Sequence, residues 1–194
     1  EPAEIDRIEG SYRKLAARDL KATGVGIGKE IAMLLIDPES TIQEATMRAA
    51  TSLKIAVDGN TLLTVVQDQK SSADLRREAL NALAAQKGEE LPAAVEAALA
   101  SDDVRLRARG LRLLADIDPA AATKHAGQVL AAASDENFNE AQQALATLAV
   151  ISKPDSDSIL TEWATKLEAN KVPPALQPDV ITAAQTRAES VPAI

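Results

Sequence analysis

The sequence predicts an all-α protein, an α-solenoid of about ten to twelve short helices that stack as helical hairpins (an α-α superhelix). Three observations predict this fold class. Apolar residues recur three or four positions apart instead of alternating, a five-residue pattern returns at nearly constant intervals, and alanine is the most frequent residue. Alanine has the highest helix propensity, and its small side chain lets neighbouring helices approach closely.

The recurring pattern has a small or apolar residue, a large apolar residue, two variable positions and another apolar residue. Its central residues are Met47, Leu80, Leu111, Leu145 and Ile181, at spacings of 33, 31, 34 and 36 residues. Spacing of this size is typical of repeat proteins, in which one hairpin cannot bury its apolar face alone. We therefore expect the five central side chains to line a shared interior.

The first segment, residues 1–24, is expected to be an N-terminal helix that covers the first repeat. The glycine-rich run Gly24-Val25-Gly26-Ile27-Gly28-Lys29 follows and predicts a flexible break between two helices. It differs from a phosphate-binding loop because Thr23 occupies the first glycine position and Glu30 follows the lysine. We expect no phosphate site there.

Residues 25–190 are expected to form five repeats of two helices each, followed by a tail at 191–194. The second helix of each repeat carries the recurring pattern. Turns rich in Ser, Asp and Pro separate the two helices; Ser and Asp accept unpaired amides at helix starts, and Pro is tolerated in a first turn. The first helices are expected at 28–36, 60–69, 89–100, 120–133 and 156–170.

Two segments, Leu75–Leu83 (LRREALNAL) and Leu106–Leu114 (LRARGLRLL), resemble HEAT-like repeats, in a form shorter than the roughly 40–47 residues usual for that class. This resemblance implies a solenoid that binds other proteins. Tetratricopeptide repeats share the 34-residue period, but their Trp, Gly-Tyr and Phe positions are not found here, so we rank that class lower.

A narrower resemblance lies near the C-terminus, in Trp163–Leu167 (WATKL) and Val172–Ala184 (VPPALQPDVITAA). These motifs are similar to a segment of large proteins of planctomycetes and verrucomicrobia, in which a sugar-dehydrogenase-like β-propeller precedes HEAT-like repeats and a cytochrome c-type haem domain follows. Pro178 and Thr182 depart from that family's pattern. The resemblance implies a connector from an exported (periplasmic) protein, with haem c in a neighbouring domain. The chain itself suits any compartment.

Composition excludes several kinds of site. The chain has no Cys and one His, so it holds no disulfide, thiolate metal site, cysteine nucleophile or covalently attached haem of its own. A formal charge of −8 and only three aromatic residues argue against general nucleic-acid binding. No apolar run approaches the roughly 18 residues of a membrane-spanning helix, so we expect no membrane insertion. We expect no catalytic, cofactor or metal-binding residue in this chain.

The one dense basic cluster is Arg105, Arg107, Arg109 and Arg112, of which 105, 109 and 112 share a helix face. Two further observations come from aligning the repeats: Arg76 corresponds to Arg107, and Arg48 corresponds to Arg112. Such positions predict a ridge that binds an acidic partner, or else a solvated face paired with nearby Asp and Glu. The candidate ridge is Arg48, Arg76, Arg77, Arg107 and Arg112.

Other notable residues have structural interpretations. We expect His125 to be a surface or half-buried histidine, Trp163 to be a core residue, and Phe138 to open a second helix. The run Asp155-Ser156-Asp157-Ser158 is expected to cap a helix start, because it is too short for a calcium loop.

We therefore expect a non-catalytic structural or protein-interaction module. It begins with Glu1 and shows no end caps, so we expect a segment of a longer protein whose last helix exposes apolar surface. Two alternatives remain: an independent peptide-binding adaptor, and a HEAT-like enzyme that modifies nucleic acid, for which the acidic charge and scarce aromatics are a poor match.

Overall fold

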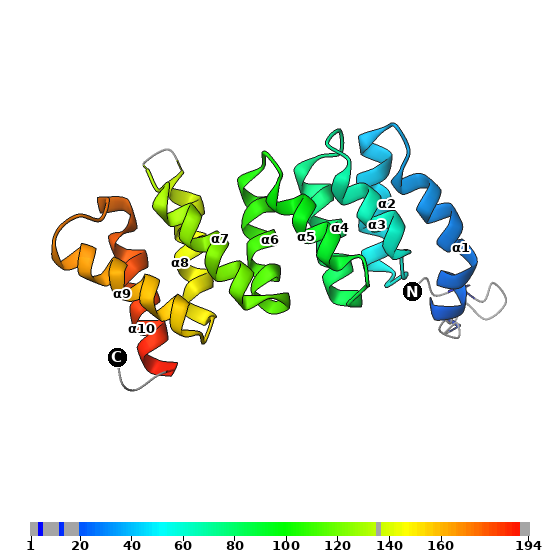
Figure 1. Cartoon of the computed structure of the whole chain (residues 1–194). Helices are drawn as coiled ribbons and strands as arrows, with labels where there is room; N and C mark the ends of the chain where they lie inside the picture. The colour runs from blue at the N-terminus through cyan, green and yellow to red at the C-terminus, as the bar shows by residue number, and fades with distance from the viewer. Residues whose placement is uncertain (1–3, 6–11, 14–19, 135–136, 191–194) are drawn as a thin grey trace. The chain divides into compact units, whose positions relative to one another are not determined.

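A computed structural model describes residues 4–5, 12–13, 20–134 and 137–190 of the chain (Figure 1). The described residues form ten α-helices, one short 3-10 helix and two strands of two residues each, so the predicted all-α class is confirmed. The chain divides into two compact units, Glu1–Thr61 and Leu62–Ile194. Within the described residues, no helix has the combined length and apolar character needed to cross a bilayer.

Unit 1 contains two packed helices, α1 (Leu20–Leu35) and α2 (Ser40–Ser52). Before them, strand β1 (Glu4–Ile5) pairs antiparallel with strand β2 (Tyr12–Arg13). A covering helix over residues 1–24 is therefore wrong at these four residues, whereas residues 20–24 are helical as part of α1. The rest of the predicted helix lies outside the described residues.

The glycine-rich segment is also corrected, because α1 continues through it without a break. Each glycine in a helix interior costs about 1 kcal/mol relative to alanine, an amount that packing elsewhere in the helix can offset. Ile31 and Leu35, at the end of α1, are buried and supply such packing.

Unit 2 contains the remaining helices. The elements are α3 (Gly59–Gln67), whose first residues precede the unit boundary, α4 (Ala73–Gln86), α5 (Leu91–Leu99), α6 (Val104–Ile117), α7 (Pro119–Ala131), α8 (Phe138–Val150), α9 (Pro154–Glu168), the 3-10 helix η1 (Pro174–Leu176) and α10 (Gln177–Ser190). The predicted first helices of the last four repeats match α3, α5, α7 and α9 to within two residues at each end.

Local side chains account for several of these helix starts. Ser72 caps α4 by accepting the amide of Leu75 at 3.2 Å, and Asp103 caps α6 by accepting the amide of Leu106 at 2.8 Å. Asp118 accepts two amides at the start of α7, and Pro119 occupies its first turn. These residues satisfy donors that no helical carbonyl can reach, as their types predicted.

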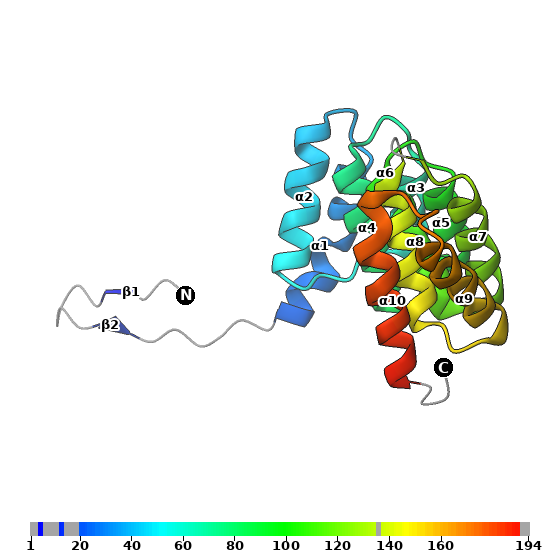
Figure 2. The same ribbon diagram turned by 90° about the vertical axis from the view of Figure 1, so that its left-hand side faces the viewer.

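The helices of unit 2 pack in two ways. Consecutive helices contact each other as hairpins, α5 with α6, α7 with α8 and α9 with α10. In addition, α4, α6, α8 and α10 contact one another in that order, so the even-numbered helices form a continuous row (Figure 2). We call α4, α6, α8 and α10 the even-helix row. Helices α5, α7 and α9 pack against one side of this row.

Four of the five predicted central residues are buried: Met47 in unit 1, and Leu80, Leu111 and Leu145 in unit 2. Ile181 is the exception, since 45% of its surface is exposed while Val180 is 2% exposed. The 3-10 helix places Leu176 in the core just before α10 starts, and the buried stripe then continues through Val180 and Ala183. The register of the last helix is therefore one residue earlier than predicted.

Candidate functional site

The five arginines of the predicted ridge lie in different environments. Arg48 is on α2 in unit 1, with its side chain 65% exposed and 3.8 Å from Glu44. Arg77 on α4 pairs with Asp74 at 2.7 Å. Arg112 on α6 is exposed, whereas Arg76 is only 8% exposed. The part of the ridge expectation that placed Arg76 on the surface is therefore wrong.

Arg76 and its repeat equivalent Arg107 join elements within unit 2. Arg76 donates from Nε to the carbonyl of Val66 at 2.8 Å and from Nη1 to Ser101 Oγ at 3.3 Å. Arg107 donates to Glu140 Oε1 on α8 at 2.5 Å and to the carbonyl of Ser101 at 2.6 Å. The hydrogen bond to the Glu140 carboxylate raises the pKa of Arg107.

The even-helix row is tied together by one polar link between each neighbouring pair. Arg109 on α6 donates to Asn81 on α4 at 2.6 Å, and Arg107 links α6 to Glu140 on α8. Gln142 on α8 then donates to Asp179 on α10 at 2.8 Å. These links use different positions of successive helices, and each one joins a helix of the row to the next.

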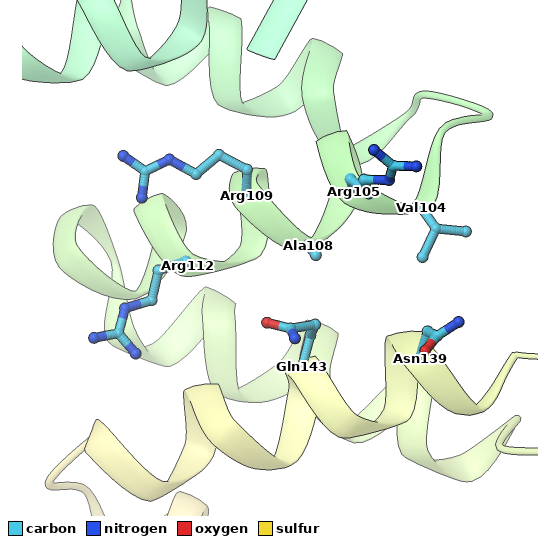
Figure 3. A pocket seen from close by; sticks show the side chains of 7 residues that line it. All are labelled: Val104, Arg105, Ala108, Arg109, Arg112, Asn139 and Gln143. Carbon is cyan, nitrogen blue, oxygen red and sulfur yellow. The ribbon is translucent and has the colours of Figure 1, made fainter. Parts of the chain in front are cut away.

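A groove of about 620 Å³ lies between α6 and α8 on this row (Figure 3). Its α6 side carries three arginines together with small apolar positions, and its α8 side carries two carboxamides. We call it the α6–α8 groove, and its lining residues are Val104, Arg105, Ala108, Arg109, Arg112, Asn139 and Gln143.

Helical spacing explains why these residues meet. Asp103 fixes the first turn of α6, and Leu106 and Leu111 turn inward to the core. Positions three and four apart share a face, so Arg105, Arg109 and Arg112 project together on the side away from that core. Asn139 and Gln143 are four residues apart on α8 and line the other side of the groove, whereas the Arg105 and Arg109 side chains extend away from α8 (Figure 3).

The groove is strongly basic. Within the described part of the chain, the side chains of Arg105 and Arg112 form no ion pair and no hydrogen bond. Arg109 uses its Nε–H toward Asn81, which leaves four guanidinium N–H donors. No acidic side chain lines the groove. The arrangement can therefore receive carboxylate or phosphate oxygens.

Arg112 also lines a second hollow of about 300 Å³. This hollow extends from the C-terminal part of α6 to the turn that follows α8, and it contains Asp116 and Lys153. Asp116 is four residues beyond Arg112 and exposed, so the positive surface of α6 ends there.

Sequence reasoning found the shared face of Arg105, Arg109 and Arg112 but missed Asn139 and Gln143. The signal for them was two exposed amide side chains four residues apart on a predicted second helix. This signal could not show that the two residues share a groove with the arginines, because that depends on α6 and α8 being neighbours in space.

The other singled-out residues have structural positions. Trp163 is 6% exposed in the core, as predicted, with Lys166 Nζ 4.9 Å from its ring centre. Phe138 opens α8 as expected, and His125 is half-buried in α7. Among the described residues, no group of three or more His, Cys, Asp or Glu is placed to hold a metal ion.

The run from Asp155 to Ser158 does not cap a helix start, because α9 begins at Pro154 and Lys153 is its cap residue. Instead, Ser156 is buried and donates to the carbonyl of Leu148 at 2.8 Å. Asp157 accepts hydrogen bonds from Arg187 on α10, whose side chain is 5% exposed. The hydrogen bond to Asp157 raises the pKa of Arg187.

Unit 1 has a different kind of hollow, of about 430 Å³, between α1 and α2. Its described lining residues are mainly aliphatic, including Ile31, Leu34 and Ile42, and none of these described residues is charged. Thr41 and Thr46 are the polar residues of this described lining, so the hollow offers mainly apolar contact.

Comparisons of the chain with models of protein families, with curated proteins and with solved structures give no match.

Proposed function

We propose that this chain is a non-catalytic protein-interaction module, a HEAT-like α-solenoid whose even-helix row binds a segment of another protein or of a neighbouring domain. The observation that carries this proposal is the α6–α8 groove, where Arg105 and Arg112 are exposed, have no side-chain partner in the described structure and share the lining with two carboxamides.

Two observations support the solenoid. The recurring pattern places Leu80, Leu111 and Leu145 at equivalent buried positions of α4, α6 and α8. Hairpin contacts between consecutive helices alternate with contacts along the even-helix row. This is the nearest-neighbour packing that a stack of helical repeats requires.

The proposal extends to the larger protein. The WATKL and VPPALQPDVITAA motifs support a repeat connector in an exported dehydrogenase-like haem protein, whose neighbouring domains would supply the bound segment. The reading frame downstream tests this part of the proposal. A Cys-x-x-Cys-His haem-attachment motif is expected there, and its absence contradicts the haem-protein assignment.

The binding function is tested by selecting peptides from a random library on the whole chain. The enriched peptides are then measured against Gln143→Trp, which fills the α6–α8 groove, and Gln128→Trp, which makes the same change on the exposed side of α7. We expect Gln143→Trp to weaken binding by roughly tenfold or more, as loss of about 1.4 kcal/mol requires. Gln128→Trp should have little effect.

Circular dichroism of both variants establishes that they fold. If no peptide is enriched, or if the enriched peptides bind Gln143→Trp as tightly as the unchanged protein, this surface is not a binding site and the proposal is wrong.

A further inference from the structure

We propose that the α6–α8 groove binds an extended protein segment that carries carboxylate side chains at alternate positions. This inference rests on the proposed interaction function and specifies the chemistry of the partner.

Charge complementarity favours carboxylates. The groove presents Arg105, Arg109 and Arg112 with no acidic lining residue, although the chain as a whole carries a charge of −8. Arginine donates pairs of N–H groups in a planar fork that matches the two oxygens of a carboxylate. Arg107, next to them in sequence, is already paired with Glu140 and takes no part.

The spacing favours an extended chain. Arg105 and Arg109 are four residues apart on α6, which is about 6 Å along a helix axis. Side chains at positions i and i+2 of an extended segment lie on the same face about 6.6 Å apart. Arg112 follows Arg109 by about 4.5 Å, a difference that its long side chain can accommodate. An extended segment with carboxylates at two or three alternate positions can therefore place each carboxylate beside one of the three arginines.

The opposite side of the groove matches the main chain of such a segment. Asn139 and Gln143 are also four residues apart, about 6 Å along α8, and each carboxamide both donates and accepts hydrogen bonds. An extended backbone presents an N–H and a C=O on one edge at every second residue, at nearly the same interval. Val104 and Ala108 leave room between the two sides.

The length of the acidic stretch is limited by the chain itself. Asp116 follows Arg112 by one helical turn and repels a further carboxylate. The helices on either side of α6 contribute no lining arginine. The acidic part of the bound segment therefore spans about five residues, over Arg105 to Arg112.

Single-stranded nucleic acid also offers anionic oxygens, but the groove is less suited to it. Nucleic-acid sites of this kind stack bases on aromatic side chains. No aromatic residue lines the groove, and Trp163 is buried. A nucleic-acid ligand is therefore the alternative that the experiment must distinguish.

The test is an NMR titration of the isotope-labelled whole chain. The probe is an acetylated, amidated octapeptide in which Glu alternates with Thr, compared with twins that carry Gln or Lys in place of Glu, and with pentathymidine. We expect the Glu peptide to shift resonances of α6 and α8 at concentrations up to about 1 mM. The affinity of the Gln twin should be lower by roughly tenfold or more.

The double variant Arg105→Gln/Arg112→Gln should bind the Glu peptide roughly 5- to 25-fold more weakly, as the loss of two exposed ion pairs predicts. The matched control Lys124→Gln/Lys171→Gln makes the same change in net charge at exposed positions outside the groove. It should stay within about twofold of the unchanged protein.

The outcomes separate this inference from the proposed function. If the Gln or Lys twin binds α6 and α8 as tightly as the Glu peptide, the interaction surface is retained but its acidic specificity is wrong. Tighter binding of pentathymidine overturns the protein partner in favour of nucleic acid. If none of the four probes binds, the inference fails, and the random-library selection still decides the proposed function independently.

Discussion

Replacing Gly110 by alanine tests how closely α5 and α6 pack. A Cβ atom at Gly110 would lie 3.1 Å from Ala98 Cβ, 3.3 Å from Leu99 Cγ and 3.3 Å from the backbone nitrogen of Leu99. A helix backbone cannot move aside as a flexible side chain can. The new methyl group therefore forces α5 and α6 apart.

Two opposing effects set the magnitude. Alanine in a helix interior is more stable than glycine by about 0.5–1 kcal/mol. Overpacking a well-filled site costs about 1–3 kcal/mol. We expect the packing cost to exceed the helix-propensity gain at Gly110, so that Gly110→Ala lowers the free energy of unfolding by about 1 kcal/mol.

Two other helical glycines provide matched controls. A Cβ at Gly127 would meet only Ile159 Cδ1 at 3.2 Å, the end of a flexible side chain, and a Cβ at Gly28 would meet nothing within 4 Å. Gly127→Ala is expected to be neutral or slightly stabilising. Gly28→Ala is expected to stabilise its unit by about 0.5–1 kcal/mol.

Urea unfolding measures all three variants. Far-UV circular dichroism follows the helices, and Trp163 in α9 is a fluorescent probe of unit 2. We expect Gly28→Ala to raise the free energy of unfolding most. Gly127→Ala should change it little, and Gly110→Ala should lower it. A Gly110→Ala protein that is as stable as the unchanged chain refutes the close packing of α5 on α6.

Two further predictions concern the core register and the dependence on pH. Leu145→Ala should lower the free energy of unfolding by about 2–4 kcal/mol because Leu145 is fully buried. Ile181 is exposed, so Ile181→Ala should change this free energy by less than about 1 kcal/mol. Equal losses for the two variants in urea unfolding contradict the corrected register. The amide of Lys70 is the main cause that holds the pKa of Asp68 below 3.8, with help from Ser71. Because this folded-state pKa is lowered, the stabilisation by Asp68 is present above the unfolded pKa of about 3.9 and is lost as pH falls through the lower folded value. Urea midpoints should show Asp68→Asn less stable than the unchanged protein at pH 7, with the difference shrinking below about pH 4; a constant difference rules out this contribution.

Several features of this protein follow from local sequence. The helix starts at Ser72, Asp103 and Asp118 were predictable because a capping side chain bonds to amides two or three residues away. The buried positions of Leu80 and Leu111 were predictable because helical periodicity and repeat spacing both select them.

Features that depend on neighbouring elements were not predictable in this way. Ile181 and Val180 are both apolar residues in the same stretch, and the 3-10 helix before α10 decides which of them is buried. The glycines of α1 were predicted to break a helix because their local preference was considered without the packing of the rest of that helix.

The candidate site shows the same division. Sequence alone determined that Arg105, Arg109 and Arg112 share one face of a helix, because that depends only on the helical pitch. The tertiary structure decided that Arg107 pairs with Glu140, 33 residues away, and that Asn139 and Gln143 line the same groove as the other arginines. The partners of a charge are set by whichever helix packs beside it, and chain spacing carries no direct information about that neighbour.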